Sequence, residues 1–244
     1  MSGDERARPA FYALAAGGWR DYVTLLHPPY TAWHLAYVVI GAALAPEVDV
    51  ARLAWTVAAF ALALGVGAHA LDELNGRPLG TRIGDRTLVV LAGLSVAGAV
   101  AIGAGATLAW TLWLAVPVTA GAFLVVAYNL ELWGGRFHGA AWFALAWGAF
   151  PVLTAYLAQA EALRVEAALA AAAAALLSLA QRRLSTEVRL LRRQVARLSG
   201  SLELHGGMTV ALDRERLLAP AEVALRLLAA STVTLAAALL VARL

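Results

Sequence analysis

The chain has 244 residues, of which 61% are apolar and only 14% are charged, a balance that excludes an ordinary soluble domain and favours a polytopic membrane protein. It has no cysteine, which excludes disulfides and thiolate sites, and its basic residues are all arginine, which excludes lysine chemistry. The net charge is +3, and the polar start MSGDERARPA shows no pattern of a cleaved signal peptide.

Seven apolar segments are long enough to cross a bilayer core of about 30 Å as helices of about 20 residues. We expect these spans near 30–46, 52–73, 87–106, 108–130, 139–160, 162–181 and 218–242. Helices are the expected form because lipid offers the backbone no hydrogen-bond partner. The chain is therefore predicted to be all-α, a transmembrane helical bundle that forms one integral-membrane domain over residues 1–244.

Arginines are distributed unevenly between the predicted loops. If residues 1–29 are a cytoplasmic or interfacial segment, the cytoplasmic side carries fifteen arginines, and the other side carries Arg52, Arg164 and Arg243. Cytoplasmic loops are enriched in basic residues. The sequence thus predicts a protein of the cytoplasmic membrane with a cytoplasmic N-terminus, and it assigns the arginines to topology and membrane lipid rather than to nucleic acid.

The largest predicted loop covers residues 182–217. Apolar residues at 184, 188, 191, 195 and 198, with arginines between them, predict an amphipathic cytoplasmic helix that continues from the sixth span. After it, SLELHGGMTVAL alternates around a His-Gly-Gly turn and predicts a small hairpin. The arginines serve either topology and headgroup contact or, at Arg182 and Arg183, recognition of a phosphate group.

Ionisable residues concentrate where the second span ends, in the stretch HALDELNGRPLGTRIGDR at 69–86. His69, Asp72 and Glu73 stand at i, i+3 and i+4, so a helix presents them on one face. Two acids at a helix C-terminus are unfavourable without a compensating cation. That cation is either a bound ligand or metal, or a neighbouring arginine such as Arg77 or Arg82 in a structural salt-bridge cluster.

The fourth span ends in a similar way, with Tyr128, Asn129 and Glu131 at the same predicted depth. Acids from both helix ends that faced one cavity would form an oxygen-rich site suited to Mg²⁺. The predicted metal ligands are Asp72, Glu73, Asn75 and Glu131. For two of the neighbouring residues a plain structural role stays open: His69 as a packing histidine and Asn75 as a helix terminator.

These stretches resemble the UbiA superfamily of intramembrane prenyltransferases over roughly residues 20–160. Asp72, Glu73 and Asn75 stand in the region of the family's first acidic motif, followed by Arg77-Pro78-Leu79 as its RPL. The segment LLHPPYTAW at 25–33 is similar to the lead into the family's first helix. YNLELWGGRFHG at 128–139 is similar to its Tyr…Lys-Arg stretch, with Tyr128 and Arg136 as the nearest matches.

The resemblance is to a divergent or shortened member. The second acidic motif should close the sixth span, where this chain has Gln181, Ser185 and Glu187. The family usually has nine spans, and seven are predicted here.

The resemblance implies a bundle around a cytoplasm-facing cavity, in which an Mg²⁺-bound isoprenoid diphosphate ionises and a lipophilic acceptor takes the prenyl group. It implies catalytic roles for Asp72, Glu73, Glu131 and Tyr128. The implied substrate contacts are His69, Asn75, Arg77, Asn129, Arg136, Arg182 and Arg183. Trp33, Tyr128, Trp142 and Trp147 are candidates for stabilising the cation through their rings.

Two other functions fit the same sequence. One is a non-catalytic bundle that binds a lipid or quinone or scaffolds a membrane complex, and the other is a small transporter. A homo-oligomer or a partner membrane subunit is compatible with each of them.

Overall fold

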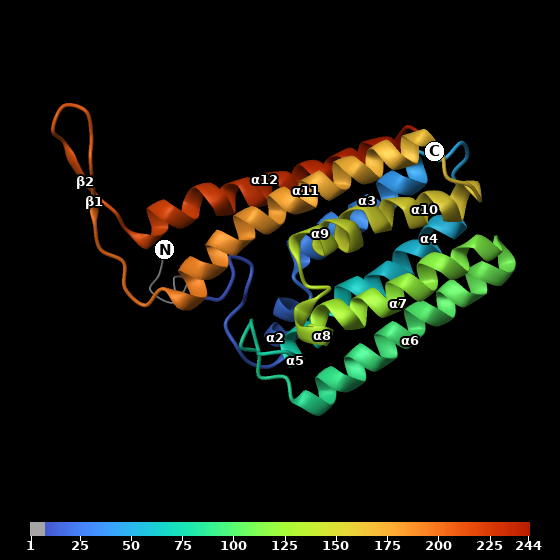
Figure 1. Ribbon diagram of the computed structural model, residues 1–244, viewed down its shortest axis with the longest axis horizontal. Coiled ribbons are helices and arrows are strands. Elements are labelled where there is room, and N and C mark those ends of the chain that lie inside the picture. Colours follow the sequence, from blue (N-terminus) through green and yellow to red (C-terminus); the bar gives the residue numbers. More distant parts are fainter. Residues whose placement is uncertain (1–7) are drawn as a thin grey trace.

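The computed structural model describes residues 8–244, which are mostly helical (Figure 1). The first seven residues of the predicted N-terminal segment, Arg6 included, lie outside the described residues. The helices in chain order are α2 (Trp19–Leu25), α3 (Pro28–Ala43), α4 (Val50–Phe60), η1 (Ala61–Ala68), α5 (His69–Leu74), α6 (Asp85–Ala109), η2 (Leu112–Leu114), α7 (Ala115–Asn129), α8 (Leu132–Gly135), α9 (Ala140–Phe143), η3 (Ala144–Ala149), α10 (Phe150–Ala160), α11 (Val165–Arg189), η4 (Leu190–Gln194) and α12 (Arg214–Val241).

Within the described residues, six continuous helices are long and apolar enough to cross a membrane. They cover Val50–Leu74, Asp85–Ala109, Leu112–Asn129, Ala140–Ala160, Val165–Gln194 and Arg214–Val241. This confirms the all-α, membrane-embedded class. The first predicted span, 30–46, corresponds to α3, which has 16 residues. At 1.5 Å per residue α3 is about 24 Å long, shorter than a bilayer core of about 30 Å.

Large apolar side chains are exposed on the outer surface of the bundle. Leu94, Leu108, Leu169 and Leu176 are each at least 67% exposed. Only 17% of the most apolar window of α6 is buried. Such a surface is suited to lipid, because in water it would drive aggregation.

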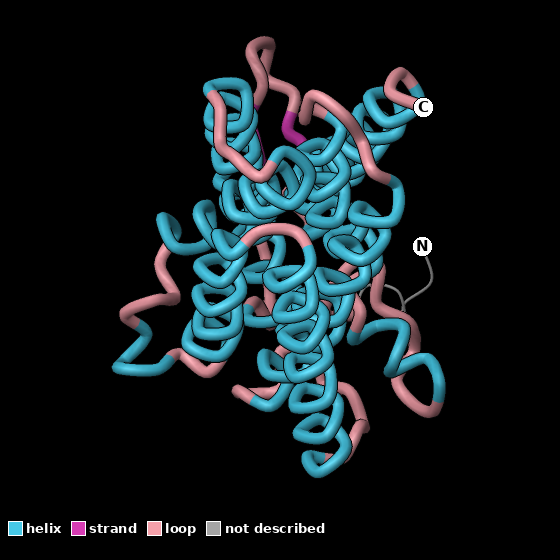
Figure 2. Tube along the Cα trace, turned by 90° about the vertical axis from the view of Figure 1, so that its right-hand side faces the viewer, coloured by secondary structure: helices cyan, strands magenta, loops and turns pink. Residues whose placement is uncertain are grey.

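The bundle has α3 near its centre and two long helices along one side. α3 packs between α10 and α12, while α11 packs on η3 and α12, and α6 packs on η1. Figure 1 shows α11 and α12 side by side, reaching past the shorter helices, and Figure 2 shows the bundle turned by 90°. Small residues permit the close contacts: a Cβ on Gly148 would lie 2.7 Å from the Ala174 carbonyl oxygen.

Three of the helices contain π-helical turns, η1, η3 and η4. A π turn inserts extra backbone into a helix and shifts the residues that follow it around the axis, and such turns are frequent beside functional sites. η1 leads directly into α5, η3 carries Trp147, and η4 carries Arg192 and Arg193. All three therefore adjoin the residues that form the candidate site.

The segment after the sixth predicted span agrees with the prediction in outline. α11 and η4 form one helix of 30 residues that ends at Gln194, so the amphipathic helix is a continuation of the span. Two antiparallel strands, β1 (Ser201–Glu203) and β2 (Thr209–Ala211), form the predicted hairpin, with Leu202 opposite Val210. The hairpin projects beyond the bundle (Figure 1).

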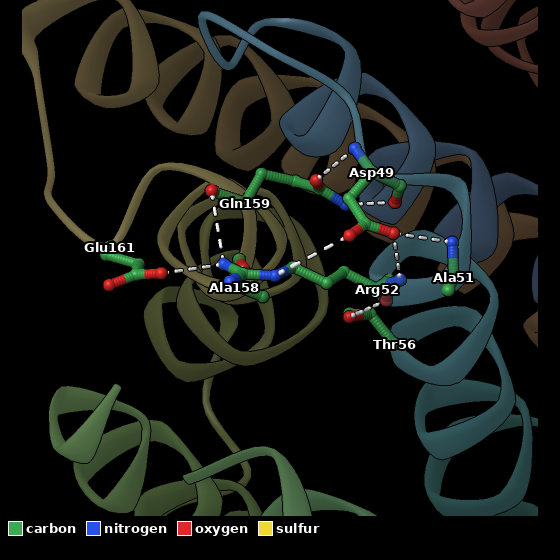
Figure 3. Close-up of polar contacts among 7 residues, drawn as sticks. All are labelled: Asp49, Ala51, Arg52, Thr56, Ala158, Gln159 and Glu161. Carbon is green, nitrogen blue, oxygen red and sulfur yellow. Dashed lines mark hydrogen bonds and ion pairs between the residues drawn. The ribbon is translucent and has the colours of Figure 1, made fainter. Parts of the chain in front are cut away.

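The opposite end of the bundle is closed by a polar tie between α4 and α10 (Figure 3). The Asp49 side chain caps α4 by accepting from the backbone N–H groups of Ala51 and Arg52. The Arg52 Nη1 donates to the Ala158 carbonyl at 3.1 Å and to Glu161 Oε1 at 2.9 Å. A cation at the C-terminal carbonyls of α10 opposes the negative end of its dipole. This tie is structural.

Candidate functional site

Polar side chains from four parts of the chain meet at the end of the bundle that carries α5. We call this group the inner polar cluster. Its members are His27, His69, Asp72, Tyr128, His138, Arg182, Arg189 and Arg193. His27 and His69 stack with ring centroids 4.0 Å apart, and Tyr128 contacts the His138 ring at 4.4 Å. The charges nearest to Asp72 include Arg193, His138 and Arg189.

The two neighbouring acids of α5 have different surroundings. Glu73 is 0% exposed, and its Oε1 accepts hydrogen bonds from Thr81 N at 2.8 Å and Thr81 Oγ1 at 2.9 Å. Its Oε2 accepts from Leu79 N at 2.9 Å. Glu73 therefore anchors the loop after α5, in place of the metal-binding and catalytic roles predicted for it.

Asp72 points to the other side of α5. It is half-buried, and within residues 8–244 its carboxylate accepts no hydrogen bond and forms no ion pair. Carboxylates that are removed from water normally have a partner. Asp72 is therefore the acid of this helix that is available to a ligand.

The loop from 75 to 85 fixes several residues that were predicted to bind substrate. Asn75 Nδ2 donates to the Asn129 carbonyl at 3.2 Å, which ties α5 to α7. Arg77 forms an ion pair with Asp85 and donates to the Ile83 carbonyl at 2.6 Å. The Arg82 backbone N–H donates to Asp21 Oδ2 at 3.0 Å. Among the described residues, neither Arg77 nor Arg82 forms an ion pair with Asp72 or Glu73. The salt-bridge cluster that the sequence left open as an alternative therefore does not match the structure either.

The remaining residues after the fourth span do not converge on Glu73. Glu131 has a left-handed backbone (φ 48°) and a side chain that is 52% exposed, 3.9 Å from His138 Nδ1. Asn129 is buried and donates to the Val125 carbonyl at 2.7 Å. Arg136 is exposed, and Arg183 pairs with Glu187 at 3.2 Å. These positions assign helix-end and surface roles to residues that were predicted to bind metal or substrate.

Two of the predicted site residues, Tyr128 and Arg182, are in contact. Arg182 Nη1 donates to Tyr128 Oη at 2.7 Å, and Nη2 donates to the His138 carbonyl at 3.1 Å. The guanidinium also lies 5.5 Å from the Phe143 ring centroid. These contacts orient Arg182 from α11 toward the end of α7.

The histidines add a polar face that the sequence did not identify as a unit. His69 Nδ1 lies 3.1 Å from the Gly65 carbonyl, and because a carbonyl only accepts, Nδ1 carries the proton. His27 Nδ1 lies 2.9 Å from Tyr12 Oη, while its Nε2 is buried with no partner among the described residues. Burial, and then the neighbouring His69, hold the pKa of His27 well below its usual range. His27 is therefore neutral at physiological pH.

The residues present do not fit the predicted magnesium ion. Residues 8–244 contain no group of three or more His, Asp or Glu side chains arranged to hold a metal. The reason is geometric: Glu73 is occupied by the loop, Glu131 faces His138, and Asp72 is left as a single carboxylate. Mg²⁺ needs several oxygen ligands in near-octahedral geometry.

An apolar cavity of about 110 Å³ lies in the bundle between η1, α6, α7 and α10. Leu64, Val125 and Trp147 line it, and each is close to the inner polar cluster. Leu64 precedes His69 by five residues, Val125 lies about one turn before Tyr128, and the Trp147 ring contacts Tyr128 at 4.4 Å. The cavity and the cluster are therefore adjacent along the same helices.

The aromatic candidates divide between the cavity and the core. Trp147 and Tyr128 lie together at the boundary between cavity and cluster. Trp33 is 0% exposed and donates to Tyr37 Oη at 2.6 Å, which makes it a core residue. Trp142 packs against the Phe137 ring at 4.9 Å.

The sequence contained signals for some of the members that were missed. His27, at the N-cap of α3, and Tyr30, His34 and Tyr37 within it follow a helical spacing, which predicts one polar stripe that includes the missed His27. Arg189 and Arg193, which were missed, follow the predicted Arg182 by seven and eleven residues and fall on the same face of α11 and its extension. No sequence signal separates Asp72 from Glu73.

Comparisons with protein families, with curated proteins and with solved structures find no match to this chain.

Proposed function

We propose that this protein is an integral-membrane enzyme resembling the UbiA prenyltransferases, which binds an isoprenoid diphosphate at the inner polar cluster. The observation that carries the proposal is the contact between a charged cluster and an apolar cavity on the same helices. Trp147 connects the two, since it lines the cavity and its ring contacts Tyr128 of the cluster. An amphiphile with an anionic head and an apolar chain matches this arrangement, because its two parts need opposite surroundings.

The head of the ligand would lie among Arg182, Arg189 and Arg193, and the chain would enter the apolar cavity past Trp147. The allylic C–O bond would break with its electron pair going to the diphosphate, whose charge the arginines stabilise. The carbocation left behind would lie against the faces of Tyr128 and Trp147. A lipophilic acceptor would attack that carbon, and its proton would pass to Asp72, the unpartnered carboxylate.

The uneven distribution of arginines supports a cytoplasmic position for this end of the bundle. Arg243 donates to the Ala45 carbonyl, and Arg52 lies beside Glu161, so both are at the opposite end. The arginine-rich extension of α11 lies at the end of the cluster. With the basic end on the cytoplasmic side, the site would open to soluble diphosphates of the cytoplasm.

A purified sample in nanodiscs tests the proposal with geranylgeranyl diphosphate, by measuring binding and the release of diphosphate. We expect the wild type to bind the compound and release diphosphate. With a lipophilic acceptor present, Asp72→Asn should bind the compound but form at least tenfold less prenylated product, because it lacks the proton acceptor. Absence of binding to the wild type would refute the proposal.

The second candidate is a non-catalytic protein that binds the same class of lipid. It is favoured by the occupation of Glu73, which removes one of the acids expected in a transferase. Binding of the diphosphate by the wild type without release, across a panel of aromatic and lipid acceptors, would support this candidate against the enzyme.

A further inference from the structure

The helix that carries the cluster's arginines is longer than a membrane span. Val165–Gln194 has 30 residues, about 45 Å at 1.5 Å per residue, whereas a bilayer core is about 30 Å thick. About ten residues therefore extend past the apolar core, and in Figure 1 α11 reaches beyond the shorter helices. Five arginines lie in the last thirteen residues of this helix, at 182, 183, 189, 192 and 193.

These arginines divide according to whether they have an acidic partner. Arg183 pairs with Glu187, and Arg192 pairs with Glu222 at 2.5 Å, so both charges are neutralised within the chain. Arg182, Arg189 and Arg193 form no ion pair within residues 8–244. The three unpaired arginines are the ones on the face of the inner polar cluster.

Within residues 8–244, the three unpaired arginines donate hydrogen bonds only to uncharged oxygen atoms. Arg182 donates to Tyr128 Oη, Arg189 Nη2 donates to Thr186 Oγ1 at 3.0 Å, and Arg193 Nε donates to the Pro9 carbonyl at 3.2 Å. A guanidinium has five N–H donors, so each keeps donors for an anion. Among the described residues, the acids close to Arg193 include Asp72 and Glu73, and three arginines against these two carboxylates leave the group with a net positive charge.

We infer that the phosphate-bearing head of the ligand is bound directly by Arg182, Arg189 and Arg193, without a divalent metal ion. Guanidinium groups match phosphate oxygens in geometry and charge, and they hold a phosphate without assembled carboxylates. This inference rests on the proposed function only for the identity of the apolar chain. The anion site itself would exist in a protein of another function.

Isothermal titration of the full chain in zwitterionic detergent tests the inference, with inorganic pyrophosphate and geranylgeranyl diphosphate as probes. We expect the Kd of each probe to change by less than about threefold between EDTA and excess Mg²⁺. Arg189→Gln and Arg193→Gln should each weaken binding by about ten- to hundredfold, as expected for the loss of a charge-assisted hydrogen bond.

Arg183→Gln is the matched control, because it removes an arginine from the same helix that is exposed and already paired. It should leave the Kd unchanged. Thermal melting of each variant verifies folding, and Arg189→Lys, which keeps the charge, should recover part of the affinity. An equal loss in the Arg183 variant would show a non-specific charge effect and overturn the inference.

The two probes separate this inference from the proposed function. Binding of the prenyl compound that requires Mg²⁺ would overturn the inference and leave the proposed function standing. Metal-independent binding of pyrophosphate, with no gain from the prenyl chain, would support the inference and contradict the proposed function. Nanodiscs with phosphatidylglycerol provide a third arm: if that lipid competes with pyrophosphate, the head bound in the membrane is a phospholipid.

Discussion

Replacing Glu73 tests whether its carboxylate stabilises the fold, in contrast to the functional role proposed for Asp72. In Glu73→Gln, the amide oxygen can still accept from Thr81, but the amide nitrogen would face the Leu79 N–H, donor against donor. Losing one buried bond in this way costs about 1–3 kcal/mol. Glu73→Ala leaves two backbone N–H groups unsatisfied, at Leu79 (6% exposed) and Thr81 (8% exposed), and should cost about 2–6 kcal/mol.

Thermal unfolding in detergent measures the loss of stability. Cleavage by trypsin shows whether the loop after α5 has opened, since this loop offers a cleavage site after the exposed Arg82. We expect a lower Tm and faster cleavage in both Glu73 variants. Asp72→Asn is the matched control, because Asp72 has no hydrogen bond from the described part of the chain. It should change stability by less than about 0.5 kcal/mol. Wild-type melting and cleavage in Glu73→Gln would refute the assignment of Glu73 as the loop anchor.

Three further predictions concern other parts of the fold. Because burial lowers the pKa of His27, the folded state binds fewer protons there, so Tm should be flat above about pH 6.5 and fall below it; His27→Gln should reduce that slope. Arg52→Ala should cost about 1 kcal/mol in unfolding free energy by releasing α4 from α10, and an unchanged Tm would contradict this. Gly41→Ala should lower the Tm, because its Cβ would lie 2.3 Å from the Val152 carbonyl oxygen, whereas Gly93→Ala, with open space, should not.

The contrast between Asp72 and Glu73 shows what the local spacing of residues can and cannot predict. Their spacing from His69 predicts one shared helix face, and the three residues do lie on one helix, but Glu73 turns to the loop whereas Asp72 does not. Which acid faces the loop and which faces the arginines depends on the π turn of η1 and on the course of residues 75–84. Neither is determined by residue spacing, since both depend on packing.

The first predicted span gives a second example. Its apolar content in the sequence equals that of a membrane helix, but α3 ends at Ala43, near Pro46 and before the Asp49 cap of α4. Its polar residue His34, and His27 at its N-cap, belong to a helix that packs between α10 and α12. Hydropathy measures how apolar a segment is and does not distinguish a helix that faces lipid from one that packs inside the bundle.

The sequence alone determined the helical class, six of the spans, the hairpin and the separation of arginines between the two ends, because each depends on local composition or period. Tertiary structure decided which charges are left without a partner. It directed the Glu73 carboxylate to a loop, paired Arg183 and Arg192 with acids, and left Asp72, Arg182, Arg189 and Arg193 without an ion pair within residues 8–244. The physical reason is that an ion pair depends on distances between helices that are far apart in the chain.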